Sequence, residues 1–296
     1  MRKEDILEYY DECTTEVSMC YSAIKSGFSE SYVDDLMRIR GYIQEPQRKL
    51  IEDMELGYMS INYSPDKDTY INGFYGLNPV NFYNHIAGNS PRAVKESFLV
   101  TTKGNFLLDN RFIIPVEDIQ GNYVALIGYY PDQSKYITAS TPFFSKEAMF
   151  FNFRRAYEMA YKDKNDPFYG TVVLVEGIFD CLSLTAIGIP AISTMGATVS
   201  PAKGELLKFF DKVLGVPDND KVGKRSLDRN DKKHGWQVPS NTTMIDFRST
   251  PLELGNGEQL KIKDMDNFVS YYPAESVKEC LVQFKNSSKL IEVLEI

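Results

Sequence analysis

The chain has 296 residues, a formal net charge of −8 at pH 7 and an ordinary globular composition, with 43% hydrophobic and 25% charged residues. This charge argues against a protein that coats nucleic acid nonspecifically, because such binding depends on many cationic contacts with phosphate; a local basic groove stays compatible with it. The sequence has no apolar run long enough to span a membrane and no secretory signal, so we expect no membrane partner and a cytoplasmic location. The four cysteines lie far apart without the pairing of a zinc site, which favours reduced thiols.

The first 60 residues carry helix signals. An amphipathic stretch begins at Ile6, and shorter helices are predicted over 31–40 and 45–56. Glycines follow both of the shorter stretches, at positions 41 and 57, where a helix typically ends.

The next part of the chain changes character. Residues 66–89 are rich in Asn, Gly, Tyr and Asp and are expected to be irregular. Apolar and β-branched residues then predict strands over 106–108, 111–116 and 123–130, with a turn at 120–122. Helices followed by strands joined through a tight turn indicate a mixed α+β subdomain.

Beyond residue 150 the pattern becomes one of buried strands alternating with helices. After a helix predicted over 150–162, the run 172–175 is wholly apolar, as in a strand buried on both faces of a parallel sheet. The run stops at Glu176, and a helix predicted over 181–187 places Asp180 near its start. An isolated buried carboxylate is costly, and this end of a strand is where ligands bind in open α/β sheets.

The same pattern repeats along the chain, with strands predicted over 190–193, 212–216 and 244–247 and a helix beginning at Ser200-Pro201. Asp218 and Asp220 follow the 212–216 strand, and residues two apart in extended chain face the same way. Carboxylates gathered at adjacent strand ends repel one another unless a cation neutralises them. Hard oxygen ligands favour Mg²⁺ or Mn²⁺.

These acidic motifs resemble a known domain. Glu176-Gly177-x-x-Asp180, Gly196 after a strand, and Asp218-x-Asp220-x-x-Gly223 resemble the Toprim domain of DnaG-like primases, phage primase-helicases, type IA and II topoisomerases and some nucleases. Stretches at 109–121, 135–146 and 263–268 resemble, in the same order, sequence blocks of the catalytic core of DnaG-like primases. The zinc ribbon that commonly precedes this core in the family has no counterpart in the sequence.

The resemblance implies an α/β fold, with a Toprim domain whose short, mostly parallel sheet is flanked by helices and preceded by a mixed α+β subdomain. The implied boundaries are 1–165 for the N-terminal subdomain, 166–270 for the Toprim domain and 271–296 for a C-terminal helical segment. The implied activity is primer synthesis, in which a divalent-metal enzyme joins ribonucleotides on single-stranded DNA and releases pyrophosphate.

The site residues follow from the same comparison. We assign Asp218 and Asp220 as the principal metal ligands and Glu176 as a ligand or general base, with Asp180 and Asp264 as further metal-site carboxylates. Basic residues within the matching blocks or beside the acidic motif are expected to contact nucleotide or DNA: Arg111, Lys135, Lys146, Lys221, Lys224 and Arg225. The expected partners are single-stranded DNA, nucleoside triphosphates, and a replicative helicase or a separate zinc-binding protein.

Other functions remain open on the sequence alone. A Toprim nuclease would use the same carboxylates to cleave nucleic acid. A noncatalytic accessory protein that binds single-stranded DNA could keep the fold, and the acidic surface and missing zinc ribbon motivate that reading. A topoisomerase is disfavoured because no separate domain carrying a nucleophilic tyrosine is evident.

Overall fold

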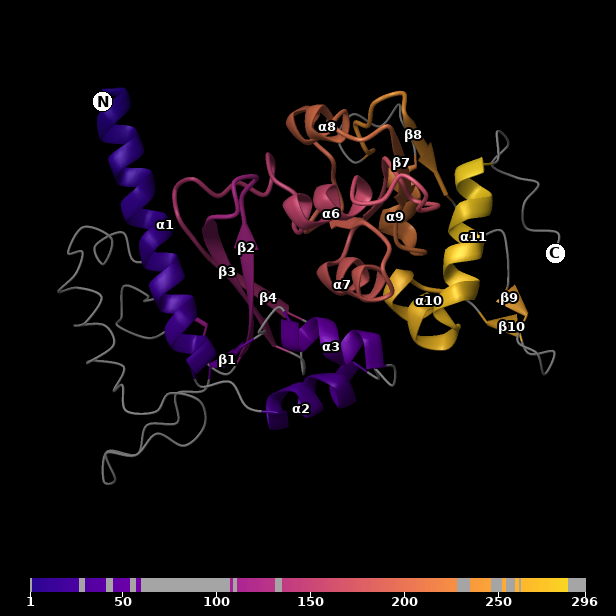
Figure 1. Ribbon diagram of the computed structural model, residues 1–296, viewed down its shortest axis with the longest axis horizontal. Helices are drawn as coiled ribbons and strands as arrows, with labels where there is room; N and C mark the ends of the chain where they lie inside the picture. Colours follow the sequence, from indigo (N-terminus) through magenta and orange to yellow (C-terminus); the bar gives the residue numbers. More distant parts are fainter. Residues whose placement is uncertain are drawn as a thin grey trace. The chain divides into compact units, whose positions relative to one another are not determined.

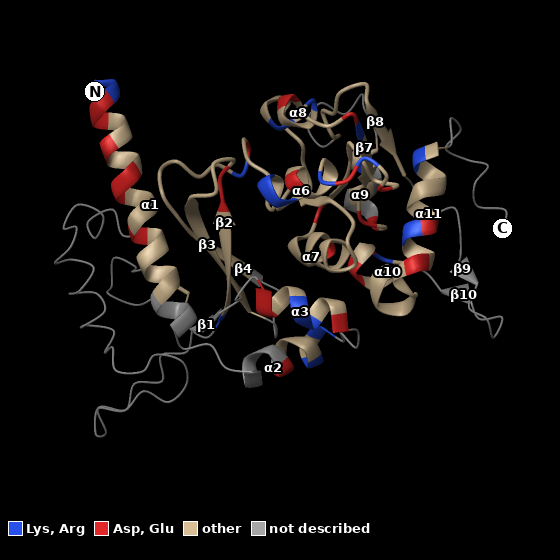
Figure 2. Ribbon diagram, viewed as in Figure 1, with Lys and Arg blue, Asp and Glu red and all other residues tan. Residues whose placement is uncertain are grey.

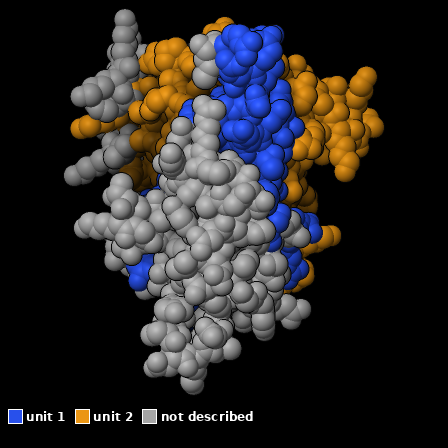
Figure 3. Space-filling view, turned by 90° about the vertical axis from the view of Figure 1, so that its left-hand side faces the viewer, with its two compact units in different colours: residues 1–42, 51–144 blue, residues 43–50, 145–296 orange. Residues whose placement is uncertain are grey.

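The computed structural model describes residues 2–26, 30–40, 45–53, 57–59, 107–108, 111–130, 135–227, 235–245, 252–253, 259–260 and 262–286. Within these ranges, no helix combines the length and apolar character needed to cross a membrane. The chain divides into two compact units, one of residues 1–42 and 51–144 and the other of residues 43–50 and 145–296 (Figure 3). The boundaries proposed from the sequence, after residues 165 and 270, do not coincide with this division and stay a proposal.

The first unit contains an antiparallel sheet with the strand order β1-β2-β3-β4 (Figure 1). Its elements are α1 (Lys3–Ser26), α2 (Glu30–Arg40), β1 (Gly57–Met59), β2 (Arg111–Glu117), β3 (Tyr123–Tyr130) and β4 (Lys135–Ser140), while α3 (Glu45–Asp53) crosses the unit boundary. α1 packs against β3, where the rings of Tyr21 and Tyr123 meet edge to face at 5.1 Å. The α+β character expected from the sequence is confirmed.

The second unit is built on a parallel sheet with the strand order β6-β5-β7-β8. Its strands are β5 (Thr171–Val175), β6 (Ala191–Ser193), β7 (Lys212–Val216) and β8 (Thr242–Met244), and a separate short pair is formed by β9 (Leu252–Glu253) and β10 (Gln259–Leu260). The helices are α6 (Phe153–Ala160), α7 (Ile178–Ala186), α8 (Pro201–Leu207), α9 (Lys221–Ser226), α10 (Met265–Tyr271) and α11 (Ala274–Asn286).

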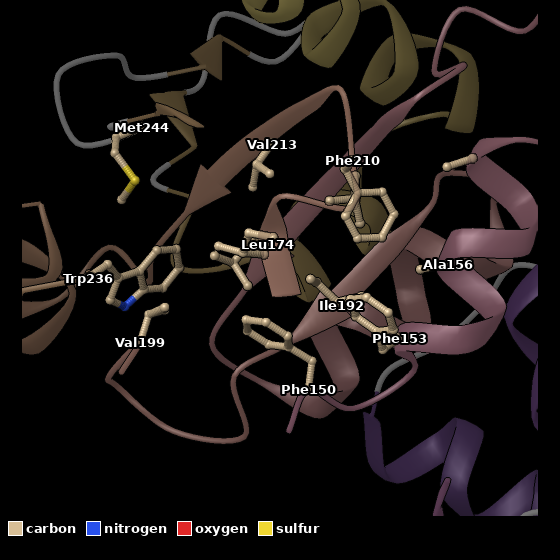
Figure 4. Packing of buried hydrophobic residues seen from close by; sticks show 13 residues of the cluster. Phe150, Phe153, Ala156, Leu174, Ile192, Val199, Phe210, Val213, Trp236 and Met244 are labelled. Carbon is tan, nitrogen blue, oxygen red and sulfur yellow. The ribbon is translucent and has the colours of Figure 1, made fainter. Parts of the chain in front are cut away.

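The core of this unit lies against one face of the parallel sheet, where aromatic and aliphatic side chains from several elements meet (Figure 4). Leu174, Ile192 and Val213 from three adjacent strands are fully buried there, together with Phe150 and Trp236 from segments far apart in the chain. A continuous apolar run such as 172–175 folds as a strand because both faces of β5 are covered, and its residues are 1% exposed or less.

The order of the strands locates the ligand-binding edge. From β5 the chain crosses through α7 to β6 on one side, whereas from β7 it continues to β8 on the other side. The carboxyl ends of β5 and β7 therefore lie at the point where the strand order reverses, which is where open α/β sheets bind ligands. Glu176 directly follows β5, and Asp218 lies two residues after β7.

Two predicted elements are placed differently. β8 covers Thr242–Met244, with Thr242 and Thr243 paired to Val213 and Leu214, so the strand predicted over 244–247 starts two residues too late and is wrong at residue 245. Residues 246 and 247 lie outside the described residues. The apolar run misled the prediction, since apolarity indicates burial and not ladder pairing. The helix predicted over 150–162 is confined to α6, because Asn152 adopts a left-handed φ of 65° and Phe151 pairs with Ser193.

Three further expectations concern other segments. Residues 107–108 lie in a turn, so the strand predicted over 106–108 is wrong at these two positions, while residue 106 lies outside the described residues. The region 66–89 lies outside them as well. The capped start of α8 is confirmed, since the Ser200 hydroxyl accepts a hydrogen bond from the Lys203 backbone N–H and Pro201 occupies the first helical position.

Candidate metal centre

Glu176 follows the carboxyl end of β5 and is held there by hydrogen bonds from neighbouring segments. Its side chain is 8% exposed, and its Oε1 accepts hydrogen bonds from the backbone N–H of Asp218 at 3.3 Å and from the Ser226 hydroxyl at 3.4 Å. The Ser193 hydroxyl donates to the carbonyl oxygen of Glu176 at 2.7 Å. The carboxylate of Glu176 is thus fixed beside the segment that follows β7.

Asp218 and Asp220 flank Asn219 in the short connection between β7 and α9. Asp220 Oδ1 accepts a hydrogen bond from the backbone N–H of Gly223 at 2.8 Å, which turns the chain sharply into α9. The turn is so tight that a Cβ atom on Gly223 would lie 1.9 Å from the carbonyl oxygen of Asp218. Only glycine, which has no Cβ atom, fits at this position without moving the backbone.

A second acidic group lies where α7 meets α10. Asp180, in the first turn of α7, is buried, and its Oδ1 accepts a hydrogen bond from the backbone N–H of Asp266 at 2.8 Å. The Ser183 hydroxyl of α7 donates to Asp266 Oδ1. Asp264 caps α10 by accepting a hydrogen bond from the Asn267 backbone N–H at 2.8 Å. Acidic stretches of the ribbon accordingly lie beside α7, α9 and α10 (Figure 2).

These carboxyls are buried and raise one another's pKa, and little positive charge offsets their repulsion. Burial, with a contribution from Asp220, raises the pKa of Glu176 to about 7. Burial followed by the charges of Glu176, Asp264 and Asp220 raises the pKa of Asp218 to about 7, against a small lowering by Lys263. The pKa of Asp180 is raised by its burial and by the charges of Asp264, Asp218 and Asp266.

The chemistry of this donor set fits a hard divalent cation. The groups offer only oxygen, and a bound cation would offset both the burial and the mutual repulsion that raise the pKa of the Glu176 and Asp218 carboxyls. In the described part of the chain, no three acidic, histidine or cysteine side chains yet surround a single point as metal ligands. Glu176, Asp218 and Asp220 as ligands of Mg²⁺ or Mn²⁺ thus stay a prediction, with Asp180 and Asp264 linked to them electrostatically.

The basic residues predicted from the sequence belong to both units of the chain. Arg111 begins β2 in the first unit, with its guanidinium carbon 5.3 Å from the centre of the Tyr130 ring. Lys146 and Arg225 are exposed in the second unit. The side chains of Lys135, Lys221 and Lys224 lie outside the described set, although their backbones belong to β4 and α9.

Three polar residues of this region were not predicted from the sequence. Ser226 links Glu176 to the carbonyl oxygen of Ala197 at 3.2 Å, and Asn219 bonds to the segment before α10. Lys203, 2% exposed, donates from Nζ to the carbonyl oxygen of Thr194 at 2.6 Å, and burial lowers its pKa to about 8. Their partners are backbone carbonyls distant in sequence, so no local spacing could identify them.

Comparison with known proteins finds a Toprim-like family model and DNA primases. Residues 173–244 match the family model described as Toprim-like. A DNA primase of Borreliella burgdorferi is 26% identical over 224 residues, covering 71% of this chain and 39% of that protein. A DNA primase of Mycoplasma pneumoniae is 32% identical over 123 residues, covering 38% of this chain and 18% of that protein. The chain thus spans well under half the length of these curated relatives.

Solved structures extend the likeness over nearly the whole chain. The DnaG primase catalytic domain bound to ssDNA matches with a TM-score of 0.65 at 16% identity, covering 94% of this chain and 80% of that one. The RNA polymerase domain of Mycobacterium tuberculosis DnaG matches with a TM-score of 0.61 at 12% identity, covering 91% and 82%. The chain contains a Toprim-like domain and has the fold of the DnaG catalytic core, as the sequence motifs predicted.

Proposed function

We propose that this chain is the catalytic core of a DNA primase, which synthesises short RNA primers on single-stranded DNA by divalent-metal-dependent nucleotidyl transfer. The observation that carries this proposal is the gathering of Glu176 and Asp218 at the strand-order reversal of a Toprim-like sheet within a DnaG-type fold. The repulsion of both groups by Asp220, and of Asp218 by Asp264 as well, supports it.

The proposed division of roles follows from position. Asp218 and Asp220 are the principal metal ligands, Glu176 is a ligand or general base, and Asp180 and Asp264 support them. Bound divalent ions would neutralise charge on the attacking and leaving oxygens during the transfer. A carboxyl such as Glu176, whose pKa is about 7, can take up a proton near neutral pH. Arg111, Lys146 and Arg225, with Lys135, Lys221 and Lys224, are proposed to position triphosphate and template.

The proposal extends to partners. Single-stranded DNA and nucleoside triphosphates are the proposed substrates, which accords with the solved DnaG domain bound to ssDNA. A replicative helicase or a separate zinc-binding protein is the proposed protein partner, and the proposed location is the cytoplasm.

The direct test is primer synthesis on mixed single-stranded templates with labelled ribonucleotides and Mg²⁺ or Mn²⁺. Replacing Asp218 or Asp220 by alanine is expected to lower the rate by roughly two orders of magnitude or more, because charge on the reacting oxygens is no longer neutralised. Asp163→Ala is the matched control, since this exposed aspartate lies at the surface, where its side chain accepts a hydrogen bond from the backbone N–H of Asn165. Undiminished synthesis in both site variants would contradict the proposal.

The same reactions distinguish a nuclease, because the acidic set is equally suited to metal-assisted hydrolysis. End-labelled template is incubated with the metal but without nucleotides. Shortening of the template that is lost in Asp218→Ala, with no primer formed when nucleotides are added, would assign the carboxylates to cleavage. Tight binding of the template with neither reaction would indicate an accessory protein.

A further inference from the structure

Asn219 makes two short hydrogen bonds that have no part in the role assigned to its neighbours. Its backbone N–H donates to the carbonyl oxygen of Lys263 at 2.7 Å, and its side-chain Nδ2 donates to the carbonyl oxygen of Ile262 at 2.7 Å. Asn219 therefore donates hydrogen bonds to two successive backbone carbonyls of the segment that leads into α10. Asn219 lies between Asp218 and Asp220, and the segment to which it bonds ends one residue before Asp264.

These bonds complete a ring of three contacts among the acidic segments. The end of β5 is joined to the segment after β7 by the bond from Asp218 N–H to Glu176. α7 is joined to α10 by the bond from Asp266 N–H to Asp180. Asn219 joins the segment after β7 to the segment before α10. Because Glu176 and Asp180 lie in one continuous stretch of chain, this contact closes the ring between the Asp218–Asp220 motif and the Asp264–Asp266 motif.

The two acidic motifs need a noncovalent contact to hold them together. The two acidic motifs are separated along the chain by residues 221–263, so covalent connection contributes little to their register. Asp218 and Asp264 repel each other as like charges. The ion pair between Lys263 Nζ and Asp264 Oδ2, at 3.8 Å and with Lys263 largely exposed, opposes that repulsion only weakly. Two hydrogen bonds to backbone carbonyls resist separation without adding charge.

We propose that Asn219 is a positioning residue, which clamps the two acidic motifs together so that their carboxylates are held ready for divalent metal. This inference rests on the proposed metal-dependent function and names a residue that acts through others and does not touch the ion. The amide suits this task because it donates a hydrogen bond and remains neutral beside two aspartates. An aspartate or glutamate at position 219 would place a further negative charge against the carbonyl oxygen of Ile262.

The test measures the binding of Mn²⁺ to the full chain by calorimetry or electron paramagnetic resonance, with primer synthesis followed in parallel. Asn219→Ala removes the side-chain bond and keeps the backbone one. Its dissociation constant for Mn²⁺ is expected to rise roughly tenfold or more, as with the loss of other groups that orient metal ligands. The rate at saturating metal is expected to stay within about threefold of wild type, because the bound ions then hold the motifs together. Asn219→Gly is a second variant for which the same shift is expected.

Asn241→Ala is the matched control. Asn241 also donates from Nδ2 to backbone carbonyls, those of Leu207 and Phe210, but does so away from the acidic motifs. Its loss should lower the melting temperature by an amount comparable with Asn219→Ala while leaving Mn²⁺ affinity unchanged. Wild-type affinity in both Asn219 variants, equal weakening in Asn241→Ala, or a lost rate that excess metal does not restore would overturn the inference. Absence of metal binding in the wild-type chain would instead defeat the proposed function itself.

Discussion

At the scale of single residues, Ser226 illustrates how a neutral group changes the pKa of a carboxyl, that of Glu176. Its hydroxyl lies between Glu176 Oε1 and the carbonyl oxygen of Ala197, and its hydrogen bond opposes the burial that raises the pKa of Glu176. The same Ala197 oxygen accepts a hydrogen bond from the indole Nε1 of Trp236 at 3.1 Å. Glu176 is thereby connected to the core of the second unit.

We predict that Ser226→Ala raises the pKa of Glu176 further, so that protons compete more strongly with metal. Mn²⁺ affinity at a pH below 7 should fall roughly threefold to tenfold, in keeping with one hydrogen bond, while affinity near pH 8 changes less. Metal titrations across the pH range measure this. Ser200→Ala is the control, because it removes a serine hydroxyl that caps α8 and should lower stability without moving the pH dependence. A uniform loss of affinity at every pH would contradict the prediction.

The residues that the sequence identified and those it missed differ in one physical respect. Glu176 directly follows an apolar run, and Asp218 and Asp220 come shortly after another, where a charge is conspicuous. The parallel sheet does bring Glu176 against Asp218. Their catalytic and metal-binding roles stay predictions. Ser226 and Asn219 act through carbonyls distant in sequence, at Ala197 and Ile262, and a hydroxyl or amide in a polar stretch carries no periodic signature.

At the scale of elements, the connection between β7 and α9 depends on Gly223. We predict that Gly223→Ala costs about 1–3 kcal/mol of stability, because the added methyl group overlaps the backbone of Asp218 and must displace it. The same displacement should weaken Mn²⁺ binding. Denaturant unfolding gives the stability, and Gly196→Ala serves as its control, since a Cβ at that position meets nothing within 4 Å. Equal stability of the two variants would show that the turn tolerates a side chain.

Strands were predictable from the sequence where the same residues are both buried and paired with neighbouring strands. β5 and β7 are apolar after their first residues, Thr171 and Lys212, and central in the sheet, so their positions were evident from the sequence. β8 lies at the edge and pairs through Thr242 and Thr243, whose polarity hid the start of the strand. The position of α10 against α7 depends on Asp266 and Ser183, a contact between residues far apart in sequence that no local pattern reveals.

At the scale of the whole molecule, the net charge of −8 includes carboxyls that the fold gathers in one region of the second unit. The fold was predictable because motif order and alternating strands and helices restrict the topology. The charge state of the centre was not predictable, because it depends on burial and on distances between side chains. Because the carboxylates of the acidic centre are buried and repel one another, they lower the stability of the metal-free folded chain. The size of this destabilisation should depend on pH.

We therefore predict that the metal-free chain loses stability as pH rises through about 7. Glu176 and Asp218 have ordinary pKa values of 4.5 and 3.8, raised in the folded chain to about 7. Between these limits the folded state binds more protons at these two groups than the unfolded state does, so their contribution to stability is greatest below the lower values and is lost as pH rises through about 7. Thermal unfolding in a chelator should give a lower melting temperature at pH 8 than at pH 6.

Added Mn²⁺ should reverse this trend, because metal binds the ionised carboxylates and favours the folded state by mass action. The rise in melting temperature on adding Mn²⁺ should be larger at pH 8 than at pH 6. Asp218→Asn should reduce both the pH dependence in chelator and the effect of the metal, which separates this carboxyl from histidines that titrate in the same range. If Mn²⁺ stabilised the wild-type chain and Asp218→Asn equally at both pH values, the carboxyls at the ends of β5 and β7 would not be the metal ligands.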